Sequence, residues 1–581
     1  MRIRIKMYWL RIAFTALATC LFLSDRGSGT ALAQDPGAQG PLAVTGRQYG
    51  SFTPAYQPPG FPRPVEQLAV IWHPTNMGNN VFPLVIFLHG RHATCYQGSA
   101  VFLEFPCRPG SQPIPNYRGY DYLAQRLASH GYIVVSISAN GINALDDATA
   151  DGGASARAWL IQRHLDIWRD FNNGRDPWGG IFRGRVNLNN VGTMGHSRGG
   201  EGVVRHVLLN ASQGSPYRVR AVLPLAPVNF SRFVVNNVPL GVLLPYCDGD
   251  VSDLSGVHYY DDARYNVTSD AAPKHTFLVF GANHNFYNTV WTPGLFPAGA
   301  FDDWVVLGGG RGTTDPHCGS EGPGKRLTAA QQRSTGWAYV QGFFRVYVGN
   351  QAQFLAYLKN DAPPPPSAQT SQIHVSYHPA ANQRLSVNRL LTSTNLTVNN
   401  LGGSVSQNGL TLYRLCGGST PQPPRCLPTN QPFQREPHAT APRVDIRPGL
   451  SQLHLSWTSP VARYINQVPQ ASGDVSGFDR IQFRAGLDFT TGFNRFASQD
   501  LSVVLTDAAG RQAAVPVSAY SRALFFPPGL QLEVPKVTLN TVRIPLSAFQ
   551  GIDLRNIRTV RFDFNRQSSG TLMISDLMFA R

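Results

Sequence analysis

The sequence predicts an α/β domain, with a mostly parallel sheet covered by helices, followed by an all-β sandwich. Three observations predict this order. Buried apolar runs alternate with helical patterns over residues 66–360, four prolines interrupt the chain within residues 361–369, and short alternating segments fill residues 370–581. Because one core stops growing at roughly 250–300 residues, a chain of 581 residues is expected to hold two domains.

In the first domain, continuous apolar stretches indicate buried strands. They lie at residues 81–89, 131–139, 190–194, 220–226, 238–246 and 275–281. Helical spacing of apolar residues occurs between and after them, at residues 120–130, 154–172, 201–209 and 329–348. Strands that are apolar throughout and are joined by helices are typical of a parallel sheet with both faces covered.

Beyond the prolines the pattern changes to short alternating segments, which are typical of antiparallel sheets with one buried face. These segments lie at residues 452–457, 480–484, 501–505, 541–544 and 559–564. The prolines favour an extended, semi-rigid linker over residues 361–369. The sequence therefore predicts a separate all-β sandwich over residues 370–581.

The first 33 residues have the pattern of an export signal. Four basic residues precede an apolar run at residues 12–23, and Ala31-Leu32-Ala33 offers small residues for cleavage. The run is shorter than the about 20 residues that span a bilayer, and a lipid anchor on Cys20 is the alternative. Residues 34–65, rich in glycine, proline and glutamine, are expected to form an N-terminal arm. We predict a secreted protein, extracellular or periplasmic, without a transmembrane segment.

The formal net charge is +16, and loss of residues 1–33, which hold five basic residues and one acidic residue, leaves +12. A basic surface can favour anionic polymers or membranes. The basic residues are scattered without a dense run, however, so nucleic-acid binding is not expected.

Six cysteines follow the predicted signal, and an even number in an exported chain favours disulfides. Pairing of neighbours is expected, which gives 95–107, 247–318 and 416–426. None of the cysteines has a C-x-x-C spacing, so zinc binding and dithiol redox chemistry are not expected.

A G-x-S-x-G motif at residues 195–199 marks Ser197 as the predicted nucleophile. The motif follows a short strand and precedes a helical run. A strained turn at that point pushes the serine oxygen out over the sheet, and the two glycines let the backbone pass closely. The alternative is a glycine-rich turn with an ordinary serine.

A serine nucleophile needs a base and an acid. His284 follows the last predicted strand and is the expected base; His258, His275 and His317 are the competitors. The preceding strand ends in a turn with three carboxylates, of which Asp250 is the expected acid and Asp248 and Asp253 are alternatives. These carboxylates could also form a calcium loop, although the bidentate glutamate of an EF-hand is missing.

The oxyanion of the reaction needs two backbone N–H donors. We expect one from Arg198, directly after the nucleophile, and one from Arg91, in the loop after the strand at residues 81–89, with His92 as the second choice. His89 and His92 can alternatively be interpreted as an H-x-x-H metal pair, but no third ligand lies nearby in the sequence. No metal and no cofactor are expected.

The segments FLHGRH, MGHSRGG and GANHNFY resemble the α/β-hydrolase superfamily, over residues 66–360. GHSRGG is similar to the elbow of chlorophyllases and of the polyester-hydrolase, cutinase-like and platelet-activating-factor acetylhydrolase-like group. This resemblance implies ester hydrolysis through an acyl-enzyme without a cofactor. It leaves open which ester is the substrate, with a polymeric or a lipid ester as the options. A long insertion at residues 286–325 departs from the small polyester hydrolases. A peptidase, a carbohydrate-ester deacetylase and a catalytically inactive binding protein remain alternatives.

The second domain more loosely resembles carbohydrate-binding jelly-roll modules, and GTLMISDLMF is like their closing strand. This resemblance implies polysaccharide or surface binding. Trp457, Tyr464, Phe483 and Phe526 are interpreted as core residues rather than a binding platform. The competing interpretation is a domain that packs on the hydrolase and supports its active-site wall.

Overall fold

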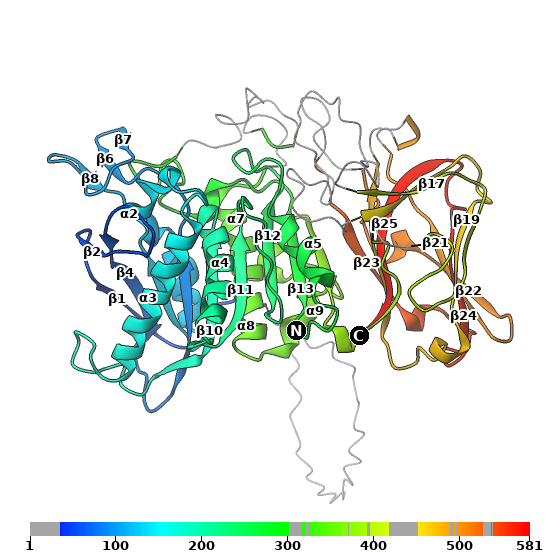
Figure 1. Ribbon diagram of the computed structural model, residues 1–581, viewed down its shortest axis with the longest axis horizontal. Coiled ribbons are helices and arrows are strands. Elements are labelled where there is room, and N and C mark those ends of the chain that lie inside the picture. The colour runs from blue at the N-terminus through cyan, green and yellow to red at the C-terminus, as the bar shows by residue number, and fades with distance from the viewer. Residues whose placement is uncertain are drawn as a thin grey trace, which may run out of the picture. The chain divides into compact units, whose positions relative to one another are not determined.

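The computed structural model (Figure 1) describes residues 35–300, 317–319, 326–369, 371–391, 395–417, 451–488, 492–494, 497–526, 536 and 538–581. The predicted export signal lies outside these residues, as do positions 301–316 and 320–325 of the predicted insertion. In the part of the chain that is described, no helix has the length and apolar character needed to cross a membrane.

A nine-stranded sheet forms the centre of the first part of the chain (Figure 1). Six neighbouring strands are parallel, and they are β9 (Ile133–Ile137), β5 (Phe82–Leu88), β10 (Val186–His196), β11 (Val219–Leu225), β12 (Leu240–Pro245) and β13 (Lys274–Val279). Antiparallel strands flank them at both ends: β4 (Ala69–Pro74) and β1 (Val44–Tyr49) beside β9, and β14 (Ile373–His378) beside β13. The predicted mostly parallel sheet is therefore present.

Both faces of the sheet are covered, because side chains alternate along each strand. On β5, Leu84, Ile86 and Leu88 join the core beneath α3 and α4, whereas Val85 and Phe87 join the core on the opposite face. The first face carries α3 (Ala154–Asn172), α4 (Arg198–Ser212) and α5 (Val257–Asn266). The opposite face carries α1 (Asp121–Ala128) and α8 (Gly342–Tyr347), and α7 (Ala329–Gly336) precedes α8 in the chain. Between α7 and α8, residues Trp337–Gln341 form a π-helical turn.

Smaller elements lie around the sheet. They are α2 (Asn140–Asn143), α9 (Leu355–Leu358), the pair β2 (Pro54–Tyr56) and β3 (Val65–Glu66), and the three strands β6 (Cys95–Gln97), β7 (Ala100–Phe102) and β8 (Gln112–Pro113). The disulfide Cys95–Cys107 lies in the segment that contains β6 to β8, and Cys247–Cys318 joins the turn after β12 to the insertion. Both pairings were predicted from the order of the cysteines; Cys426, of the third predicted pair, lies outside the described residues.

Two further antiparallel sheets follow in the chain. The first contains β17 (Leu410–Gly417), β18 (Ser451–Trp457), β25 (Gly570–Ala580), β20 (Arg480–Leu487), β23 (Asn540–Pro545) and β15 (Arg384–Asn388). The second contains β16 (Val405–Asn408), β19 (Arg463–Gln467), β24 (Ile557–Asp563), β21 (Ser502–Asp507) and β22 (Gln512–Pro516). Side chains from both sheets share one apolar core, which includes Trp457, Tyr464 and Phe483. This arrangement is compatible with the predicted β-rich second domain.

Two predicted boundaries are wrong. Residues 34–65 are not only an arm, because β1 within them is the edge strand of the central sheet. Residues 370–581 are not a separate sandwich, because β14 pairs with β13 in the same sheet. The segment at 361–369 is also held in place, since Asp361 pairs with Arg480 and Arg543 at 3.2 and 2.8 Å. Residues 35–581 form one compact unit.

Candidate active site

Ser197 lies on a sharp turn between β10, which ends at His196, and α4, which begins at Arg198. Its backbone has φ 57° and ψ −124°, a conformation that costs free energy for a residue with a side chain. The glycines around it allow close backbone approach, since a Cβ at Gly195 would lie 2.0 Å from the carbonyl oxygen of Gly199, and a Cβ at Gly90 would lie 2.5 Å from Cβ of Ser197. The predicted elbow is therefore formed, and the loop after β5 lies directly against Ser197.

His284 lies just after β13, at the same edge of the sheet, and its side chain is buried. Its Nδ1 is 2.8 Å from Oδ2 of Asp248, in the turn after β12. Asp248 is fully buried, and its Oδ1 accepts the backbone N–H groups of Asp250 and Val251 at 3.0 and 2.6 Å. These two bonds fix the direction of the Asp248 carboxylate, so its second oxygen remains for the imidazole.

The expectation that Asp250 holds the imidazole does not agree with this geometry. The Asp250 side chain is 49% exposed, and its Oδ2 lies 3.5 Å from Nε2 of His284, on the other side of the ring from Nδ1. Asp253, the third candidate, accepts the backbone N–H of Ser255 at 3.1 Å. The turn folds back on Asp248, so the first of the three carboxylates, and not the second, contacts Nδ1.

The nucleophile and base segments lie side by side. The ring of His196, the residue before Ser197, has its centroid 4.8 Å from that of His284. Trp291 packs on both histidines, with centroid distances of 4.7 and 6.4 Å, and donates its indole N–H to Asn116. Tyr120 bonds Nδ1 of His196 at 2.9 Å, and burial keeps the pKa of His196 well below its ordinary value. A neutral His196 therefore places no positive charge beside His284.

The two expected oxyanion donors are the backbone N–H groups of Arg91 and Arg198. Arg91 follows Gly90, which lies against Ser197, and Arg198 follows Ser197 and begins α4. Among the hydrogen bonds of the described residues, neither N–H has an acceptor. The first N–H groups of a helix have no partner within it and carry its positive dipole end. These groups are therefore available to an anion that develops beside Ser197.

The side chains of Arg91 and Arg198 are held by a pair of carboxylates that the sequence analysis did not identify. Arg198 lies 3.0 Å from both Asp146 and Asp147, and Arg91 also pairs with both. Asp146 is fully buried and is joined by Arg157 of α3 at 2.7 Å. The two carboxylates therefore restrict the positions of both guanidinium groups. No spacing signal in the sequence connects residues 146–147 to positions 91 and 198.

Glu201, in the first turn of α4, is a buried carboxyl group close to Ser197 in the sequence. It accepts the backbone N–H of Ser231 at 2.8 Å, which ties the loop after β11 to the helix. Burial raises the pKa of Glu201 to about 7. The group is therefore close to half protonated at neutral pH.

The competing histidines have structural partners. His275 contacts the carbonyl of Leu358 and the hydroxyl of Tyr347, and its pKa is lowered to about 3 by burial. His258 is buried within α5, and His317 packs on Tyr246.

The alternative metal pair has structural partners as well. His89 uses one ring nitrogen for the N–H of Ala139 and the other for the carbonyl of Gly90, and His92 stacks on Trp291. In the described chain, the one cluster with metal-ligand geometry is Cys247, His317 and Cys318, and both of its sulfurs form the disulfide.

The class of the fold follows from this arrangement. A serine on a strained strand-to-helix turn, at the carboxyl edge of a parallel sheet and beside an acid–histidine pair, is typical of α/β hydrolases, and the first part of this chain has the α/β-hydrolase fold. A family model described as PET hydrolase-like matches residues 114–292, the stretch that contains Ser197, Asp248 and His284.

Part of the chain is also similar in sequence to a particular protein. The chain is 28% identical over 162 residues to the bis(hydroxyethyl) terephthalate hydrolase of Streptomyces coelicolor. The aligned stretch covers 28% of this chain and 38% of that protein, so it spans well under half the length of the relative. Both comparisons are with hydrolases by their descriptions.

Proposed function

We propose that the protein is a carboxylic-ester hydrolase that uses Ser197, His284 and Asp248 as its catalytic triad. The observation that carries the proposal is the contact between Nδ1 of His284 and Asp248, beside a serine on a strained turn. In this mechanism Asp248 accepts the Nδ1–H of His284 and so selects the tautomer whose Nε2 can take a proton.

The reaction then has two halves. His284 removes the proton of the Ser197 hydroxyl as its oxygen attacks the ester carbonyl, and the N–H groups of Arg91 and Arg198 stabilise the resulting oxyanion. The protonated imidazole gives its proton to the leaving alcohol, and the acyl group stays on Ser197. Water, activated by the same histidine, releases the acid and restores the serine.

The substrates that we propose are esters with an apolar acyl group. Phe230 is 46% exposed and lies beside the guanidinium of Arg198, at 5.6 Å from the ring centroid, so an apolar ring flanks the residue after the nucleophile. The name of the relative, a bis(hydroxyethyl) terephthalate hydrolase, suggests aromatic diesters as a first substrate to test. The disulfides are compatible with a secreted protein, and we propose that it acts outside the cytoplasm.

The test compares Ser197→Ala with Ser212→Ala, an exposed serine at the far end of the same helix. We expect the first variant to lose nearly all hydrolysis of p-nitrophenyl acetate and of bis(hydroxyethyl) terephthalate, while the second keeps the parent's rate. A fluorophosphonate should label the parent and the control but not Ser197→Ala. Labelling or hydrolysis that survives the loss of Ser197 would refute the proposal.

A further inference from the structure

A lysine from the β-rich part of the chain contacts the turn that carries Asp248. Nζ of Lys536 donates to the backbone carbonyl of Asp248 at 2.7 Å, and the backbone N–H of Lys536 donates to the hydroxyl of Tyr246 at 3.2 Å. The ammonium lies 6.0 Å from the centroid of the Tyr246 ring. Lys536 lies 288 residues from Asp248 and is only 6% exposed, so this contact joins distant parts of the sequence inside the molecule.

The same turn is fixed from its other side by the hydrolase domain. The N–H of Cys247 donates to the carbonyl of Ala282 at 2.8 Å, two residues before His284, and Cys247 is bonded to Cys318. The Asp248 backbone therefore lies between a segment that carries the base and a lysine that belongs to the β-rich part. Because the direction of the Asp248 carboxylate depends on the Asp248 backbone, a contact at the backbone carbonyl of Asp248 also affects the position of its carboxylate.

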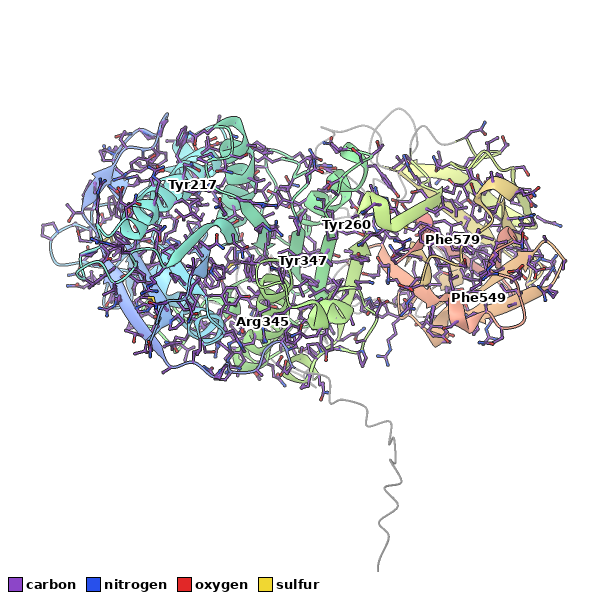
Figure 2. The ribbon with its side chains drawn as sticks, turned by 90° about the horizontal axis from the view of Figure 1, so that it is seen from below. Tyr217, Tyr260, Arg345, Tyr347, Phe549 and Phe579 are labelled. Atoms are coloured by element: carbon purple, nitrogen blue, oxygen red, sulfur yellow. A yellow bond between two sulfur atoms is a disulfide. The ribbon has the colours of Figure 1, made fainter. Side chains whose placement is uncertain are left out.

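The helix that follows the turn is also anchored in the β-rich sheets. Arg264 of α5 pairs with Asp576 of β25, and Arg484 of β20 pairs with Asp261 of α5 at 2.7 Å. All four side chains are buried, and Arg484 also lies over the ring of Tyr260, which is labelled in Figure 2. Removing one partner of a buried ion pair leaves an uncompensated charge, so separation of these two parts of the chain would leave buried charges without their partners.

We infer that Lys536 is a positioning residue for the catalytic acid, and that the β-rich part of the chain is a component of the active site. This inference rests on the proposed function of Asp248. A buried ammonium needs partners, and the Asp248 carbonyl is one of them. Loss of this donor frees the Asp248 backbone to rotate, and small displacements of a catalytic group can cost as much as about 100-fold in rate.

The experiment measures kcat and KM for p-nitrophenyl acetate in full-length Lys536→Met. We expect kcat to fall about tenfold and KM to stay within about twofold, because the acid acts on the chemical step and not on substrate binding. The matched control is Lys359→Met. Lys359 is also a largely buried lysine that lies over a tyrosine ring and contacts Asp361, but it does not contact the turn that carries Asp248, which we call the acid turn. Its kcat should equal that of the parent.

Two further variants complete the test. Lys536→Arg keeps a charged donor and should restore most of the lost kcat. If Lys536→Met does not fold, Lys536→Gln replaces it. The glutamine side chain is one bond shorter than that of lysine, so its amide nitrogen does not reach the Asp248 carbonyl, and we expect the same loss of kcat. Equal kcat in Lys536→Met and the parent, or equal losses at positions 536 and 359, would overturn the inference. A parent that hydrolyses no ester would instead refute the proposed function, independently of Lys536.

Discussion

Nδ1 of His284 lies 2.8 Å from Oδ2 of Asp248, whereas Asp250 lies 3.5 Å from the opposite ring nitrogen. The two carboxylates therefore have different relationships to one imidazole. A carboxylate at Nδ1 orients the ring and stabilises its charged form, while a group near Nε2 stands on the side where the proton is transferred.

The first prediction is that Asp248→Asn lowers kcat for soluble esters by up to about 10⁴-fold, because an amide favours the wrong imidazole tautomer. Asp250→Asn and Asp253→Asn should lose far less, since neither side chain contacts Nδ1. Steady-state kinetics on the three purified variants measure the difference. If Asp250→Asn were the most damaged of the three, the acid would be Asp250, and the Asp248 contact would be structural.

The difference between the expected contact of Asp250 and the observed contact of Asp248 with Nδ1 has a local physical cause. From sequence, the strand before the turn and the three aspartates were identified, but the offset depends on two bonds from backbone N–H groups to Oδ1 of Asp248. Such side-chain-to-backbone turns depend on dihedral angles and leave no distinctive spacing. The places of Ser197 and His284 at the ends of β10 and β13, in contrast, follow from the sequence, because a G-x-S-x-G motif and a histidine after the last parallel strand have fixed places in the topology.

The same reasoning explains the two boundary errors. β1 is an edge strand with two exposed residues, and its sequence VTGRQY lacks the apolar run that indicates β5 or β13. β14 is fully buried, but its sequence alternates polar and apolar residues as an antiparallel strand does, and alternation does not tell which sheet a strand joins. Lys536 lies far from Asp248 in sequence, so only tertiary structure connects them.

The second prediction concerns Glu201 and pH. Its pKa is raised to about 7 by burial, so the folded state holds a proton that the unfolded chain releases near pH 4.5. The stabilisation of the folded state by the protonated Glu201 is fully present below pH 4.5 and is lost as the pH rises through about 7. Glu201→Gln should therefore gain stability relative to the parent between pH 5 and pH 8, by up to about 3 kcal/mol. Urea unfolding of the parent and of Glu201→Gln at pH 5 and at pH 8 measures this change in the free energy of unfolding.

The control for Glu201 is Glu104→Gln, at a partly exposed carboxylate whose pKa is lowered by its hydrogen bond to Arg108. This variant should not gain stability over the same range, because lowering of the pKa has the opposite sign. A Glu201→Gln difference that does not change between pH 5 and pH 8 would show that Glu201 is ionised throughout.

The third prediction compares the two disulfides. Cys247–Cys318 closes a separation of 71 residues and Cys95–Cys107 one of 12. In the chain-entropy model these bonds are worth about 4 and about 3 kcal/mol. Replacing both cysteines of each pair by serine should give this order of losses in denaturant unfolding. Loss of the first pair should also lower kcat more, because Cys247 is adjacent to Asp248. Equal kcat in the two double variants would contradict a role of this bond in holding the acid turn.

The last prediction tests whether the β-rich part can be separated from the hydrolase. A chain that ends at Asp361 lacks β14 and leaves the edge of β13 without its partner. A chain that ends at Pro379 keeps β14 but loses Lys536 and the partners of Asp261 and Arg264. We expect both truncated proteins to have a lower melting temperature and to lose activity on soluble esters and on a solid polyester in parallel.

The chain that ends at Pro379 is decisive, because a separable surface-binding module would leave its kcat on p-nitrophenyl acetate within a few-fold of the parent and reduce only the activity on the solid. That outcome would show that the β-rich part adds binding alone. Parallel loss on both substrates would show that the hydrolase requires it, since its removal leaves the buried charges of α5 unpaired and the acid turn without its lysine.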